Sequence, residues 1–77
     1  MVVIDVTPWT TAPQNADRIN VRRRSDGKYE CTGSVARGNA ILLNPDICSS
    51  ADDARNCGLA WAEANGSNVV YLRMPET

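Results

Sequence analysis

Two stretches of alternating polar and apolar residues flank Ser25-Asp26-Gly27, and they constrain the fold of this 77-residue chain more than any other feature. A period of two residues is the pattern of a strand with one buried face, so the sequence predicts a β-hairpin. A two-residue turn would place the apolar sets of the two strands on opposite faces of the sheet. A three-residue loop, with Gly27 in the left-handed conformation, pairs Val21 with Cys31 instead. Because a slip of one residue reverses every side chain, we expect the three-residue loop.

Three further strands are predicted from local composition. Residues 2–7 are rich in β-branched side chains, and this strand ends where the irregular loop 8–17 begins. The turn signal Arg37-Gly38-Asn39 precedes the short apolar run 40–43, which ends at Asn44-Pro45 and in which Leu42 is expected opposite Val35. The last strand, residues 69–74, should direct Val70, Leu72 and Met74 toward the core.

Between residues 49 and 65 the pattern changes to that of a helix, predicted over about 50–65. Ser49 or Ser50 is the expected N-cap, and Asn65-Gly66 the expected C-terminal stop. At 100° per residue, one apolar face contains Ala54, Cys57, Trp61 and Ala64, whereas Leu59 is placed on the polar side. We expect Gly58 to let the helix approach a sheet closely.

The sequence therefore predicts an α+β fold with the order β-β-β-β-α-β, in one small domain spanning residues 1–77. The single helix should pack on one face of a two-layer, antiparallel-rich sheet. The opposite face of the hairpin is almost wholly polar, as a single-helix domain requires. Local patterns leave the order of the strands in the sheet undetermined.

Composition argues against an enzyme. The chain has no histidine, the commonest general base, and it contains no nucleophile elbow or phosphate-binding glycine loop. We therefore expect no catalytic residues, no cofactor and no metal site.

The three cysteines, Cys31, Cys48 and Cys57, have no Cys-x-x-Cys spacing and are expected to be small buried side chains. The alternative concerns Cys48, whose position before a helix N-terminus would lower its pKa and make it a reactive thiol.

Charge is unevenly distributed along the chain. Residues 18–37 contain six basic and two acidic residues, a balance of +4, although the whole chain carries −1. On the outer face of the hairpin, Arg22, Arg24 and Lys28 could contact phosphates, which would make this face a nucleic-acid or anion-binding surface. The alternative is a solvated strand face, with Arg22 opposite Glu30.

Trp9 lies in the loop 8–17 between Pro8 and hydroxyl residues. Tryptophan is frequent at interface hot spots, so Trp9 is a candidate interaction residue. The alternative is that the loop folds back and Trp9 acts as a lid over a small core.

Residues 18–74 are predicted to form a hairpin, a third strand, a capped helix and a closing strand. This order of elements resembles that of antitoxins of the HicB type, and the resemblance would imply that the chain binds a partner protein. The resemblance rests on element order and on turn and capping residues. Phage-integrase arm-binding domains have a similar pattern, from which the last strand here departs.

We expect a cytoplasmic, non-enzymatic protein-interaction or self-associating domain, because a small core and exposed sheet edges favour pairing with another chain. Nucleic-acid binding by the hairpin is the alternative, and no membrane association is expected.

Overall fold

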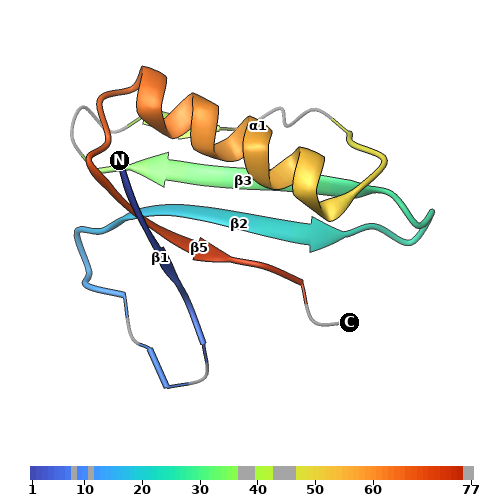
Figure 1. The fold of residues 1–77 in the computed structure, drawn as a ribbon, viewed down its shortest axis with the longest axis horizontal. Coiled ribbons are helices and arrows are strands. Elements are labelled where there is room, and N and C mark those ends of the chain that lie inside the picture. Colours follow the sequence, from blue (N-terminus) through green and yellow to red (C-terminus); the bar gives the residue numbers. More distant parts are fainter. Residues whose placement is uncertain (8, 11, 37–39, 43–46, 76–77) are drawn as a thin grey trace.

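The computed structural model describes residues 1–7, 9–10, 12–36, 40–42 and 47–75 of the chain (Figure 1). One helix packs against a five-stranded mixed sheet, which confirms the predicted α+β class and element order. The elements are β1 (Val2–Asp5), β2 (Asp17–Arg23), β3 (Tyr29–Val35), β4 (Ala40–Leu42), α1 (Ala51–Ala64) and β5 (Val69–Arg73).

The strand order is β1-β5-β2-β3-β4, so the last strand of the chain lies between the first and the second (Figure 1). β5 runs parallel to both of its neighbours, whereas β2, β3 and β4 form an antiparallel meander. Both edge strands are short, since β1 has four residues and β4 has three. The parallel half of the sheet could not be foreseen from local patterns.

The β2–β3 hairpin has the predicted register, with Val21 paired to Cys31 and Arg22 paired to Glu30. Gly27 has a φ of +82°, the left-handed conformation that the three-residue loop requires. Across β3, however, Val35 pairs with Ala40, and Leu42 pairs with Gly33. The expected pairing of Leu42 with Val35 was therefore wrong by two positions, a shift that keeps Leu42 on the core side of the sheet.

Two further predictions concerned the connections on either side of β4. The turn at Arg37-Gly38-Asn39 and the strand end at Asn44-Pro45 lie outside the described residues.

α1 packs against β2 and β3, and we call the sheet face beneath it the inner face (Figure 1). The predicted contact face of the helix was correct for Ala54 and for Trp61, which packs against the core, and wrong for Cys57 and Ala64. Leu59, expected on the polar side, also packs against the core. Cys57 and Ala64 are exposed, whereas Ala54, Gly58 and Ala62 are buried. These three residues follow each other at intervals of four, and their small side chains let the backbone come close to the sheet. The inner face of the sheet supplies the remaining core side chains: Ile19, Val21, Cys31, Val35, Val70 and Leu72.

Both helix ends carry the predicted stops. The Ser50 hydroxyl accepts a hydrogen bond from the Asp53 N–H at 3.1 Å, so Ser50 is the N-cap. At the other end, Gly66 has a φ of +86°, and its N–H donates to the Glu63 carbonyl. The Ser67 N–H donates to the Ala62 carbonyl, which completes a Schellman motif.

Candidate functional site

The sheet face opposite α1, the outer face, carries polar residues from three neighbouring strands. Parallel pairing places Tyr71 beside Arg18, and Arg73 beside Asn20. Tyr71 and Arg73 were not among the predicted interaction residues, which came from the hairpin and from the loop 8–17. Their own alternation with the core residues of β5 is the signal that would have placed them on this face, but only the strand order reveals their neighbours.

Two of the three predicted anion-binding residues are paired with acids. Arg22 forms an ion pair with Glu30, and Arg24 contacts both Glu30 and Asp26, at 3.4 and 3.3 Å. The hydrogen bond from Arg22 lowers the pKa of Glu30, and Arg24 adds to this effect. The positive charge of Arg22 and Arg24 is therefore largely matched within the hairpin itself.

Lys28 lies next to the hairpin loop and is exposed. Its backbone N–H donates to Asp26 at 3.0 Å, and this bond is the main cause that lowers the pKa of Asp26. Of the three predicted residues, Lys28 alone forms no ion pair within the described part of the chain.

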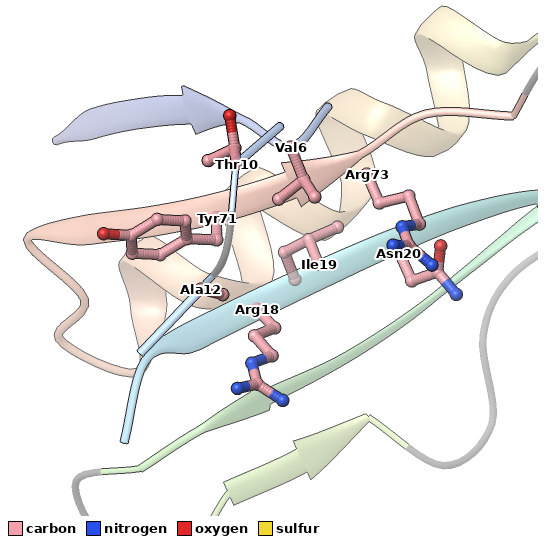
Figure 2. Close-up of a pocket in the computed structure, with 8 residues that line it drawn as sticks. All are labelled: Val6, Thr10, Ala12, Arg18, Ile19, Asn20, Tyr71 and Arg73. Atoms are coloured by element: carbon pink, nitrogen blue, oxygen red, sulfur yellow. The ribbon is translucent and has the colours of Figure 1, made fainter. Parts of the chain in front are cut away.

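Two other outer-face cations, Arg18 and Arg73, form no ion pair with any residue that the structure describes. Arg18 donates from Nη2 to the Pro13 carbonyl at 2.8 Å, which ties its guanidinium to the loop before β2. Arg73 extends from β5 next to Asn20 (Figure 2). Among the described residues of the outer face, positive charge without a matching carboxylate is therefore found at Arg18 and Arg73 on β2 and β5, as well as at Lys28 next to the hairpin loop.

A hollow of about 460 Å³ lies among these residues, between the outer face and the segment that follows β1 (Figure 2). Its volume is within the range of small-ligand pockets. The residues that line it are Val6, Thr10, Ala12, Arg18, Ile19, Asn20, Tyr71 and Arg73. In Figure 2 the guanidinium group of Arg18 lies below β2 and that of Arg73 lies beside Asn20, so the two cations are separate.

Trp9 is 93% exposed. The Thr7 hydroxyl accepts from the Trp9 N–H at 3.2 Å and contacts the Thr10 hydroxyl at 2.9 Å, and the Thr10 N–H donates to the Thr7 carbonyl. These bonds close a tight turn that includes Trp9 and leaves its side chain exposed to solvent. The expectation that Trp9 forms a lid over the core was therefore wrong, and its interaction role stays a prediction.

The outer edge of β1 is a second candidate surface. The Val2 N–H donates to the Asn68 carbonyl and the Val6 N–H to the Leu72 carbonyl, so the even-numbered residues hydrogen-bond toward β5. Because backbone groups alternate along a strand, Val3 and Asp5 direct theirs toward the other edge of β1, where no described strand pairs with it and which we call the free edge. Val2 is 57% exposed, and its sheet neighbour Val69 is also exposed. The edge thus combines available backbone groups with apolar side chains.

Cys48 lies two residues before the N-cap and forms an isolated bridge with Tyr29. Its Sγ atom lies 4.0 Å from Sγ of Cys57, which is exposed rather than buried as expected, whereas Cys31 is buried as predicted. Burial raises the pKa of Cys48, and the thiol of Cys57 adds to the rise. This direction is opposite to the one expected from the helix N-terminus, so the reactivity of Cys48 stays a prediction without support from its pKa.

Comparison with known proteins gave no match to a family model, a curated protein or a solved structure. None of the described helical segments has the length and apolar character needed to cross a bilayer. Within the described ranges, no cluster of three or more thiols and carboxylates is arranged to hold a metal ion.

Proposed function

We propose that this chain is a non-enzymatic protein-interaction domain, and that the free edge of β1 is its main contact surface. The partner we assign to this edge is a second copy of the chain. The observation that carries the proposal is the outward direction of the backbone groups of Val3 and Asp5, in an edge strand that also exposes the apolar side chain of Val2. Such an edge is a template for strand pairing.

A two-fold axis at Ile4 would pair two β1 strands antiparallel. Val3 of each copy then exchanges backbone hydrogen bonds with Asp5 of the other, and the two Ile4 residues face each other. Val2 of each copy lies opposite Val6 of the other. Since Val3 packs toward the core, Val2, Ile4 and Val6 all lie on the outer face. The pairing therefore brings together apolar side chains, and the two Asp5 carboxylates lie at opposite ends of the paired segment.

The small size of the chain gives a reason for such pairing. A domain of this length buries only about 60% of the surface of its unfolded chain. Joining two sheets at β1 would cover the exposed side chain of Val2 and hydrogen-bond the outward backbone groups, without repacking the core under α1.

Sedimentation equilibrium from about 1 µM to about 1 mM tests the proposal. We expect a species of twice the chain mass of 8.4 kDa to form as the concentration rises. Ile4→Lys places two like charges at the axis and should abolish the dimer. The matched control is Ile41→Lys, on the opposite edge strand β4, where Ile41 is 60% exposed.

Circular dichroism must show that both variants stay folded. A monomer at every concentration would refute the proposal. Loss of the dimer in Ile41→Lys together with its retention in Ile4→Lys would assign the association to β4 instead.

A second candidate function is the binding of single-stranded nucleic acid on the outer face. The positions of Arg18 and Arg73 near Tyr71 favour it, because neither arginine forms an ion pair with a residue in the described part of the chain. Guanidinium groups bind phosphates, and a tyrosine ring can stack on a base. Because Arg22 and Arg24 are engaged by acids, we propose this surface around Arg18 and Arg73 rather than at the hairpin tip.

Fluorescence anisotropy with a labelled DNA oligonucleotide tests this candidate. Replacing Arg18 and Arg73 together by glutamine should reduce the salt dependence of the binding constant by about one unit per lost phosphate contact. The control variant, with Arg23 and Arg55 replaced by glutamine, removes the same charge elsewhere. Equal losses in both variants would leave only non-specific attraction and contradict the assignment.

A further inference from the structure

We propose that Cys48 and Cys57 are a modification site: a dithiol that a small-molecule disulfide oxidises to an intramolecular disulfide. The two Sγ atoms lie 4.0 Å apart, although the cysteines are nine positions apart in the sequence. This site lies beside α1 and does not depend on the edge of β1 or on the outer face.

The backbone on both sides of the pair is held by regular structure. Cys48 exchanges two hydrogen bonds with Tyr29, its N–H donating at 2.7 Å and its carbonyl accepting at 2.9 Å. Cys57 lies in the middle of α1. A disulfide bond is about 2.05 Å long, so the two sulfurs must approach by about 2 Å. Because Cys57 is exposed, rotation of its side chain toward Cys48 meets solvent rather than packed core.

The different burial of the three thiols sets the order of the reaction. Cys57 is exposed, Cys48 is half-buried and Cys31 is buried under α1. Burial and the neighbouring thiol raise the pKa of Cys48, which reduces its thiolate fraction. The accessible Cys57 is therefore the residue that meets the oxidant first, and Cys48 is the resolving thiol.

The chemistry balances with oxidised glutathione as the oxidant. The Cys57 thiolate attacks one glutathione sulfur, a mixed disulfide forms, and the first glutathione leaves with the proton that Cys57 has lost. The Cys48 thiolate then attacks the Cys57 sulfur, and the second glutathione leaves with the proton from Cys48. Two thiols of the protein are oxidised to one disulfide, and one glutathione disulfide is reduced to two thiols.

Trypsin separates the three cysteines, which makes the connectivity readable. Cleavage after Lys28, Arg37, Arg55 and Arg73 releases peptides 29–37, 38–55 and 56–73, with one cysteine in each. The folded full-length chain is incubated with oxidised glutathione, free thiols are blocked with N-ethylmaleimide under denaturing conditions, and the digest is analysed by mass spectrometry. We expect peptides 38–55 and 56–73 joined by a disulfide, with a blocked thiol on Cys31.

Single serine variants complete the test. Cys31→Ser should still form the disulfide, whereas Cys48→Ser should stop at the glutathione adduct of Cys57. A wild-type chain that stops at this adduct would overturn the proposal. It would also be overturned if Cys57 instead joins to Cys57 of another molecule, or if all three thiols are blocked.

Discussion

The position that a Cβ atom would take at residue 58 lies 2.6 Å from Cγ2 of Ile19, so the α1 backbone at Gly58 rests directly on this β2 side chain. Ile19 is 1% exposed. From the other side, a Cβ at residue 33 would lie 2.5 Å from Cδ1 of Ile19. Two glycines, one on the helix and one on β3, thus make the space that Ile19 fills, and the distance between the helix and the sheet depends on both.

Replacement of Gly58 by alanine should destabilise the protein. Overpacking a core costs about 1–3 kcal/mol, and the better helix propensity of alanine returns at most about 1 kcal/mol. We expect a net loss of about 1–2 kcal/mol in the free energy of unfolding, measured by urea denaturation. The control Asn56→Ala changes an exposed helix position, where a somewhat smaller gain in helix propensity meets no clash.

A double-mutant cycle separates the clash from other effects of the substitution. Ile19→Leu removes the branch at Cβ that meets residue 58. The cost of Gly58→Ala should therefore be smaller in the Ile19→Leu background than in the wild type. Strict additivity of the two changes would contradict the contact as the cause.

Asp17 joins three segments that are distant in sequence. Its Oδ2 accepts from the Ser67 hydroxyl at 2.6 Å and its Oδ1 from the Ala36 N–H at 2.8 Å. Ser67 is 6% exposed. Asp17→Ala leaves the buried hydroxyl without this acceptor, and we expect a loss of about 1–3 kcal/mol in unfolding free energy. Removing both partners with Ser67→Ala should cost less than the sum of the single changes, whereas the exposed Asp52→Ala should change little.

The N-cap assignment can be tested with two adjacent serines. Ser50→Ala removes the side chain that accepts from the Asp53 N–H and should lower the unfolding free energy by about 1 kcal/mol. Ser49→Ala, one residue earlier on the exposed surface, should change it by less than about 0.5 kcal/mol. Thermal or urea denaturation of both variants decides between them, and a larger effect at Ser49 would contradict the assignment.

Local features of the sequence were sufficient to predict the parts of the fold that local physics determines. The hairpin register was predictable because a slip would expose Val21 and Cys31. The helix ends were predictable because Ser50 and Gly66 have specific capping geometries. The contact face of α1 was predicted correctly at Ala54 and Trp61 but wrongly at Cys57 and Ala64, because the helix rests on the sheet at Gly58.

Long-range neighbours could not be derived in this way. Val70 and Leu72 have the pattern of a buried strand, whichever strands lie beside them, so the position of β5 between β1 and β2 stayed open. For the same reason the proximity of Tyr71 and Arg18 on the outer face was not foreseen. The pairing of Arg22 with Glu30 was predictable from the register. The second contact of Glu30, with Arg24, depends on side-chain conformation and is visible only in the structure.

The acids of the hairpin predict how stability depends on pH. The pKa of Glu30 lies below its ordinary value of 4.5 and that of Asp26 below 3.8, because arginine side chains and the Lys28 N–H stabilise the charged forms. A lowered pKa in the folded state contributes stability that is present above the ordinary pKa and is lost as the pH falls below it. Urea midpoints of the wild type should therefore decline below about pH 4.5.

Glu30→Gln should be less stable than the wild type at neutral pH, and the two should converge in acid. Glu63→Gln, at an exposed position on α1, is the control and should follow the wild-type profile. A difference between wild type and Glu30→Gln that is the same at both ends of the pH range would show that the carboxylate charge contributes nothing to the stability of the hairpin.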